Sequence, residues 1–278
     1  MSEEYLGSSI ELRELILSTA KEQIPGLDQI NPEEVEAVTD NALKMVNEFE
    51  KAARGNPHPK IWEDTDVVWD IPAAGIFSNE LQKLPEWQDR YRHLNWSRKM
   101  ERARVRTSSA IVRQVTSLRV QKKPEQLTQE DIISNGPTLI YSGTPNQQEN
   151  LRIAMAELAN KYKFPPREKV LIVKGVKNTD GTYRDVNNTV DDVQALVLPD
   201  GLIPRRIVVV SHAQHLVRIL HILGKFHEAL PPSTIIQPYP LLVPKEGREK
   251  YTEMEIRGTL AAIYGSHLAT NQPYPYQV

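Results

Sequence analysis

The sequence predicts an α/β protein in which helices cover both faces of a mostly parallel β-sheet, preceded by an N-terminal helical hairpin. From residue 66 onward, short apolar runs alternate with longer segments of helical periodicity. This alternation is typical of parallel strands joined by crossover helices. Before residue 56 the apolar residues follow helical spacing alone. We therefore expect a helical extension over residues 1–55 and an α/β domain over residues 56–278.

The two N-terminal helices are predicted from apolar spacing and from one helix-start signal. Residues 9–24 form the first expected helix. Its apolar positions include Ile10, Leu15 and Ile16. Residues 31–55 form the second, with Asn31 as the N-cap and Pro32 at the first helical position. Its apolar stripe consists of Val38, Ala42, Met45, Val46 and Phe49.

The remaining elements alternate, and their order in the sheet is left open. Strands are expected at 66–71, 137–143, 168–175, 205–211 and 233–243. Helices are expected at 87–120, 144–162, 187–198, 212–226 and 249–269. The helix at 87–120 is rich in arginine, and it would place Arg102 or Arg106 over the ligand pocket. Its charges favour a solvated, salt-bridged surface over a nucleic-acid interface.

The composition fits a globular protein and excludes several kinds of site. Of the 278 residues, 40% are hydrophobic and 25% are charged, which is ordinary for a chain that folds around its own core. Without cysteine the chain has no disulfide, thiol nucleophile or thiolate-ligated metal. A net charge of −2 favours neither nucleic acid nor an anionic membrane. With no long apolar run and an acidic, polar start, a cytoplasmic protein is expected.

Polar residues gather where the expected strands end. They are Asp70 after the first strand, Ser142 and Gly143 after the second, Asn188 and Thr189 after the third, and Ser211 and His212 after the fourth. Ligands of open parallel sheets bind outside these carboxyl ends. The unpaired N–H groups of the following helices favour an anion there. For Asn188 and Thr189, helix capping explains the residues equally well.

His215 and Arg218 are the sharpest candidates for chemistry. They are three residues apart on an expected helix and therefore share a face. Arg218 is suited to bind a carboxylate or phosphate, and His215 to donate to the ligand or move a proton. A solvated His–Arg pair explains the spacing equally well. His212 and His215 have no evident third partner in the sequence, so we expect no metal.

Together these motifs resemble the YdcF-like family, which includes SanA- and ElyC-type proteins. The matching stretches are YSGTPNQQE with Ser142, Gly143 and Glu149, NNTVDDV with Asn188 and Thr189, and VSHAQHLVR with Ser211, His215 and Arg218. The resemblance runs from about Asp66 to the last helix. It implies a Rossmann-like three-layer fold with a polar pocket of unsettled chemistry.

The sequence also departs from the family pattern. The turn after the first strand is DIPAAG rather than glycine-rich, and Thr144 stands where the family has the second glycine of Ser-Gly-Gly. Fewer glycines leave less room for the backbone to approach a phosphate. We therefore expect a ligand that differs from that of a typical member.

Three hypotheses of function follow. The first is an enzyme that acts on a phosphate- or carboxylate-bearing, nucleotide-like metabolite by hydrolysis or group transfer. His215, Arg218 and Ser211 are its catalytic candidates. Its substrate-binding candidates are Asp70, Ser142, Gly143, Glu149, Asn188, Thr189 and His212. The second is a non-catalytic module that binds a nucleoside such as S-adenosylmethionine. The third is an interaction protein that uses its N-terminal helices. The sequence indicates neither a cofactor nor an oligomeric state.

Overall fold

The computed structural model describes residues 10–56, 60–71, 97–143, 155–156, 164–174, 203–225, 228, 230 and 232–277. Within these residues, five parallel strands form one sheet in the order β3-β2-β1-β4-β5. The strands are β1 (Thr65–Asp70), β2 (Thr138–Gly143), β3 (Val170–Lys174), β4 (Arg206–His212) and β5 (Ile235–Leu241). This arrangement confirms the predicted α/β fold.

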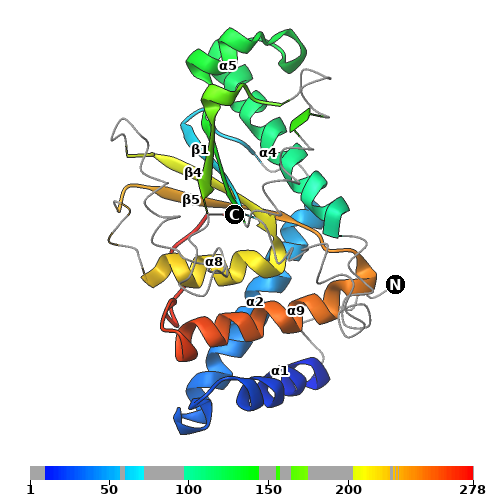
Figure 1. The fold of residues 1–278 in the computed structure, drawn as a ribbon, viewed down its shortest axis with the longest axis vertical. Helices are drawn as coiled ribbons and strands as arrows, with labels where there is room; N and C mark the ends of the chain where they lie inside the picture. Colours follow the sequence, from blue (N-terminus) through cyan, green and yellow to red (C-terminus); the bar gives the residue numbers. More distant parts are fainter. Residues whose placement is uncertain are drawn as a thin grey trace.

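Helices cover both faces of the sheet (Figure 1). One face packs on α8 (Ala213–Lys225) and α2 (Pro32–Gly55), with α9 (Lys245–Leu260) and α1 (Ile10–Gln23) beyond. The other face packs on α4 (Ser97–Val120), which contacts α5 (Gln129–Asn135). Single helical turns are η2 (Leu27–Gln29), η5 (Pro124–Gln126), η6 (Arg167–Lys169) and the π-helical η8 (Ala261–Gly265). The helices expected at 144–162 and 187–198 lie outside the described residues, apart from 155–156.

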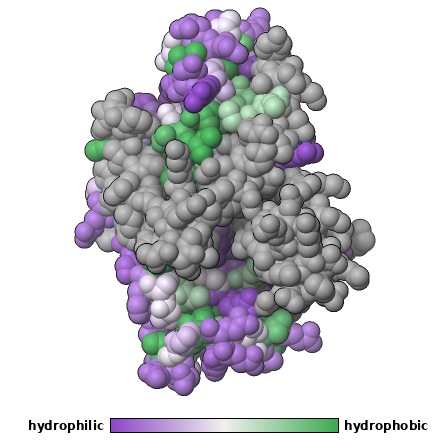
Figure 2. All heavy atoms as spheres, viewed as in Figure 1, coloured by the Kyte–Doolittle hydropathy of each residue, from purple (hydrophilic) through white to green (hydrophobic). Residues whose placement is uncertain are grey.

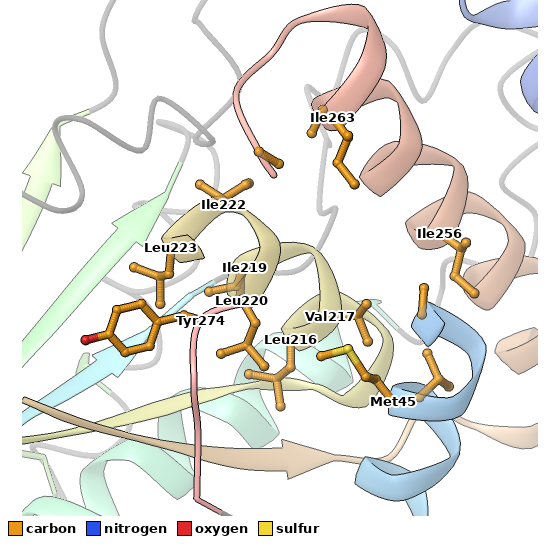
Figure 3. Close-up of a cluster of buried hydrophobic side chains, with 14 of the residues drawn as sticks. Met45, Leu216, Val217, Ile219, Leu220, Ile222, Leu223, Ile256, Ile263 and Tyr274 are labelled. Atoms are coloured by element: carbon orange, nitrogen blue, oxygen red, sulfur yellow. The ribbon is translucent and has the colours of Figure 1, made fainter. Parts of the chain in front are cut away.

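Alternation along the central strands divides the core between the two faces. Val67 and Trp69 of β1 face α2 and α8, whereas Val68 faces α4, because successive side chains of a strand point to opposite faces. Figure 3 shows Leu216 and Val217 of α8 beside Met45 of α2, with Ile256 of α9 nearby. Every residue of β4 is buried, as expected of a strand with helices on both sides.

The N-terminal helices belong to the same core. The Asn31 side chain accepts a hydrogen bond from the Glu33 N–H at 3.1 Å, and the predicted stripe of α2 is buried. Both findings confirm the expectation for this helix. The first expected helix is present as α1, and two of its apolar residues, Ile10 and Leu15, are 71% and 50% exposed.

The buried stripe of α1 consists of Leu12, Ile16 and Ala20, four residues apart, on the face that packs on α9. The surface at the α1–α2 end of the molecule is mostly hydrophilic with scattered apolar spots (Figure 2). Helices α1 and α2 thus share one hydrophobic core with α8 and α9, while the domain boundary at residue 55 stays a prediction.

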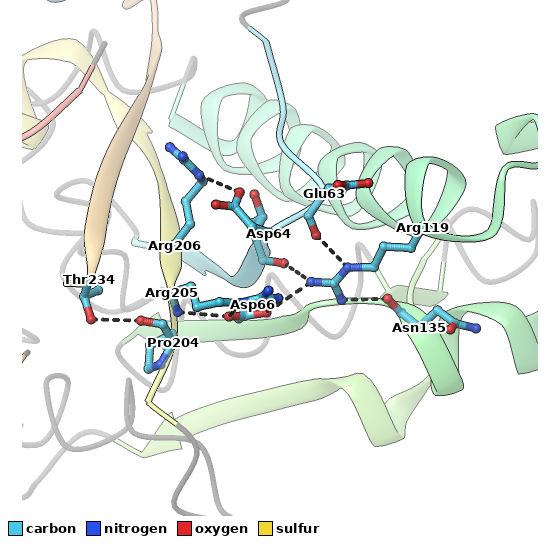
Figure 4. A network of polar contacts seen from close by, with 10 residues as sticks. Glu63, Asp64, Asp66, Arg119, Asn135, Pro204, Arg205, Arg206 and Thr234 are labelled. Carbon is cyan, nitrogen blue, oxygen red and sulfur yellow. Dashed lines mark hydrogen bonds and ion pairs between the residues drawn. The ribbon is translucent and has the colours of Figure 1, made fainter.

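An ion-pair network, which we call the amino-edge network, joins the segments at the start of β1 and β4 (Figure 4). Asp66 accepts two hydrogen bonds from the Arg205 guanidinium, at 2.9 and 3.0 Å, and one from Arg119 at 3.1 Å. Arg119 also donates to the main-chain oxygens of Glu63, Thr65 and Asn135. Arg206 pairs with Asp64 at 2.8 Å. The network fixes the register in which β1 enters the sheet beside β4.

None of the described helices is both long enough and apolar enough to cross a bilayer.

The final helix differs slightly from the sequence expectation. It begins at Lys245 rather than residue 249, and its α-helical part ends at Leu260. The following π-helical turn, η8, leads into a C-terminal segment that returns across α8, where the Tyr274 N–H donates to the Leu220 carbonyl at 2.9 Å.

Candidate functional site

The strand order reverses direction between β1 and β4. From β1 the chain proceeds to β2 and β3 on one side, and it then returns to β4 and β5 on the other. In doubly wound sheets, the carboxyl ends of the two strands at such a reversal are where ligands bind. Here those ends are Asp70 of β1 and the Ser211–His212 pair of β4.

Asp70 is held by an arginine from the layer above the sheet. The Arg104 Nε of α4 donates to Asp70 Oδ1, and both side chains are fully buried. The Arg104 guanidinium carbon lies 5.7 Å from the centre of the Tyr141 ring of β2. A buried ion pair is costly to desolvate unless its geometry is good, so its place at the strand ends is consistent with a functional constraint.

On the opposite face, Glu255 of α9 receives two side chains of α8. His215 Nδ1 lies 2.9 Å and Arg218 Nε 3.2 Å from the same oxygen, Glu255 Oε2. Burial opposes ionisation of Glu255, but the Arg218 charge and the His215 hydrogen bond prevail and lower its pKa to about 2. The carboxylate is therefore charged at neutral pH.

An ionised Glu255 decides the tautomer of His215. Arg218 Nη2 also lies 3.1 Å from His215 Nδ1, and if Nδ1 carried a lone pair, Arg218 could donate to it. A lone pair on Nδ1 would then face the carboxylate at 2.9 Å, which is repulsive. Nδ1 therefore carries a proton and donates it to Glu255.

His212 and Tyr251 lie between these two charged groups. The rings meet edge to face with centroids 6.3 Å apart. Burial, followed by the Arg104 charge, lowers the pKa of His212 well below its usual value, so this imidazole is neutral. Burial and the Glu255 charge raise the pKa of Tyr251. The His212 Nδ1 atom is buried and makes no hydrogen bond with the described residues. Because buried polar atoms rarely lack a partner, this atom is a candidate contact for a ligand or a water molecule.

Ser211 connects the two central strands. Its hydroxyl donates to the carbonyl of Ile71, the residue after β1, at 2.9 Å. The hydroxyl proton is thus engaged, and the bond holds the exit of β1 against the end of β4. Its predicted catalytic role stays a prediction, and the contact favours a role in positioning.

The structure brings together five of the predicted site residues. Of the others, some lie at the end of a neighbouring strand and the rest are not described. Those that meet around the ends of β1 and β4 are Asp70, Ser211, His212, His215 and Arg218. Ser142 and Gly143 end β2, the strand beside β1. Glu149, Asn188 and Thr189 lie outside the described residues.

Sequence reasoning missed three members of the site, Arg104, Tyr251 and Glu255. Arg104 faces the sheet and pairs with Asp70, whereas Arg102 and Arg106 are exposed, and their position over the pocket stays a prediction. The helix phase contained this signal: Arg104 lies four residues before Ser108 and eight before Val112, both buried. Tyr251 and Glu255 are likewise four apart on a buried stripe that Thr259 continues.

A cavity of about 540 Å³ lies away from this site, between α5, η6 and residues 155–156. Apolar side chains such as Leu127, Ile132 and Phe164 line it together with Arg113 and Arg167. None of the predicted site residues contributes to its lining. In the part of the chain that the structure describes, no cluster of three or more His, Asp or Glu side chains is arranged to hold a metal.

Comparisons with protein-family models, curated proteins and solved structures find no match for this chain. The YdcF-like resemblance therefore stays a prediction. What is known of the site comes from its own geometry.

Proposed function

We propose that this chain is an enzyme, of the YdcF-like type suggested by its motifs, that acts on a phosphate- or carboxylate-bearing metabolite at the ends of β1 and β4. Nucleotides are the first substrate class to test. The observation that carries the proposal is the hydrogen bond from His215 to a buried, ionised Glu255. A carboxylate that fixes an imidazole in one tautomer is the arrangement that prepares histidine for proton transfer.

The chemistry we propose is hydrolysis of an ester or phosphoester. His215 Nε2 accepts a proton from water while the water oxygen bonds to the carbonyl carbon or the phosphorus. The same Nε2–H then protonates the leaving oxygen as its bond to that centre breaks. Glu255 stabilises the transient imidazolium, and Ser211 holds the strand ends at which the substrate lies.

The anionic part of the substrate would bind at the start of α8. This helix has 13 residues, and its first N–H groups carry partial positive charge. Arg218 adds a cation at the same place, and its side chain is 14% exposed, whereas that of Arg104 is fully buried. Arg218 is therefore the arginine expected to contact the ligand.

The proposal is tested with the full-length protein and two chromogenic probes, p-nitrophenyl phosphate and p-nitrophenyl acetate. We expect His215→Ala to lower kcat/KM by about 10²- to 10⁴-fold, the usual contribution of a general base. Binding of AMP, measured by calorimetry, should be largely retained. His267→Asn is the control, because His267 is exposed and asparagine tolerates its positive φ of 54°.

Two results would contradict the proposal. If His215→Ala turns over either probe as fast as the unchanged protein, His215 is not the base. If neither probe is hydrolysed but AMP or S-adenosylmethionine binds, the chain is the non-catalytic nucleoside-binding module.

A further inference from the structure

A second buried carboxylate, Glu50 of α2, lies beside the candidate site. Its Oε2 accepts from Arg54 Nη2 at 2.7 Å, and its Oε1 accepts from Gln214 Nε2 at 2.8 Å. Arg248 Nε of α9 lies 3.4 Å from the same Oε1. Glu50 and Gln214 are both fully buried. None of these residues is among the sequence-predicted site residues.

The partners of Glu50 are neighbours of the residues that carry the proposed chemistry. Gln214 is the second residue of α8 and directly precedes His215. Arg248 precedes Glu255 on α9 by seven residues, about two helical turns. One carboxylate of α2 thus contacts both the helix that presents His215 and the helix that presents Glu255.

The bond to Glu50 is what orients Gln214. The other end of the Gln214 amide, Oε1, is buried and makes no hydrogen bond among the described residues. Glu50 itself stands in an apolar stripe, next to Phe49 and one turn after Val46. A hydrophobic residue there would avoid the desolvation cost of a buried charge, so packing alone does not account for the carboxylate.

We propose that Glu50 is a positioning residue of the site, which sets the alignment of α8 and α9 at which His215 Nδ1 meets Glu255. This inference rests on the proposed function of His215. It also makes the second N-terminal helix, which lies outside the YdcF-like resemblance, a structural part of the site rather than a separate docking element.

The experiment measures how fast the His215 Nδ1–H proton exchanges with water, by NMR of the full-length protein at neutral pH. The His215→Ala spectrum assigns the signal. We expect Glu50→Gln to accelerate exchange about tenfold. Weakening one hydrogen bond that holds α8 lowers the free energy of the local opening that exposes the His215 proton to water. The control is Glu48→Gln on the same helix, where an exposed Glu48 accepts from the Tyr276 hydroxyl at 3.4 Å. In this control variant the His215 Nδ1–H proton should exchange at the same rate as in the unchanged protein.

A second variant keeps the test decisive if Glu50→Gln does not fold. Gln214→Met retains the side-chain length and removes the donor to Glu50, and it should accelerate exchange in the same direction. Folded samples are identified by near-ultraviolet circular dichroism before exchange is compared. If proton exchange in either folded variant stays within about twofold of the control, the inference is overturned. The bond between Glu50 and Gln214 would then contribute less than one ordinary hydrogen bond to holding His215 in place.

The two proposals fail in different ways. Full turnover by His215→Ala would refute the enzymatic proposal without changing the exchange comparison. Unchanged exchange in Glu50→Gln would refute the positioning role while the loss of turnover in His215→Ala still stood. If a substrate is hydrolysed, Glu50→Gln should lower kcat more than it raises KM, since it displaces the base rather than the binding groups.

Discussion

Strands β1 and β4 carry acidic and basic side chains at both of their ends, but the amino edge is partly exposed to solvent and the carboxyl edge is buried. At the amino edge, Asp66 accepts from an Arg205 side chain that is 66% exposed, and Arg119 donates to three main-chain carbonyls. At the carboxyl edge, Asp70, Arg104, His215 and Glu255 are all buried, and His212 Nδ1 makes no hydrogen bond with described residues.

The difference separates a structural network from a candidate site. The amino-edge network is partly solvated, and its charges pair with one another and with main-chain oxygens, so it can stabilise strand register at little desolvation cost. The carboxyl edge holds charges where they are costly to desolvate, and the buried His212 Nδ1 makes no hydrogen bond among the described residues. Such an arrangement is consistent with selection for chemistry rather than for stability.

The largest expected effect is loss of a carboxylate at the carboxyl edge. Asp70→Asn removes the negative charge that pairs with the fully buried Arg104 guanidinium, and we expect the free energy of unfolding to fall by about 3–5 kcal/mol. The amino-edge counterpart, Asp64→Asn, removes a carboxylate that is 36% exposed and should cost about 1 kcal/mol or less. Urea unfolding measures both. Equal losses would remove the distinction between the edges.

The next effect is a dependence on pH that belongs to Glu255. Its pKa falls from 4.5 to about 2 in the folded protein. A lowered pKa contributes stability that is fully present above 4.5 and is lost as the pH falls toward about 2. We therefore expect Glu255→Gln to be less stable than the unchanged protein by about 3 kcal/mol at neutral pH. Urea unfolding should show this gap closing in acid; a gap independent of pH would contradict the ion pair.

A substitution beside Arg218 should lower turnover while it changes the stability of the fold only slightly. A Cβ on Gly258 of α9 would lie 2.8 Å from Arg218 Nη1, so Gly258→Ala displaces the guanidinium from Glu255. The helix propensity of alanine offsets part of the cost, and we expect stability to change by no more than about 1 kcal/mol. Turnover of the chromogenic probe should nevertheless fall about 10- to 100-fold.

The matched control is Gly55→Ala at the end of α2. Among the described residues, apart from its chain neighbours and its own helix backbone, no atom lies within 4 Å of a Cβ at that position, so turnover should be unchanged. Equal turnover in the two variants would show that the position of Arg218 is not important for the site.

The smallest effect belongs to the exposed end of the amino-edge network. Arg205→Ala removes a largely solvated partner of Asp66 and should lower stability by about 0.5 kcal/mol in dilute buffer. The difference should vanish in about 1 M NaCl, since salt screens exposed pairs. Probe turnover should not change. A loss of turnover here would mean that the two edges are coupled.

The sequence predicts the fold well because the fold depends on patterns repeated along the chain. Apolar strands alternating with helices predict the parallel sheet, and Asn31 with Pro32 predicts the start of α2. The buried face of α1 is less readable, because Ile10 and Leu15 are apolar yet exposed. Apolar spacing over a short helix allows more than one face, and here packing on α9 selects the face of Leu12, Ile16 and Ala20.

The site was half predictable for a related reason. His215 and Arg218 lie in the first two helical turns after a buried strand, so their proximity can be predicted from the local sequence. Glu255 lies 40 residues from His215 along the chain, and it becomes its partner because α9 packs beside α8. That pairing depends on the helix layer and on the strand order, neither of which the sequence pattern determines.

The central claim is that Glu255 holds His215 with its proton on Nδ1 and its lone pair on Nε2. Heteronuclear NMR of the His215 imidazole nitrogens at neutral pH tests it most directly. We predict a protonated Nδ1 and an unprotonated Nε2 in the unchanged protein, and a mixture of both tautomers in Glu255→Gln. A protonated Nε2 in the unchanged protein, with Nδ1 accepting from Arg218, would contradict the claim.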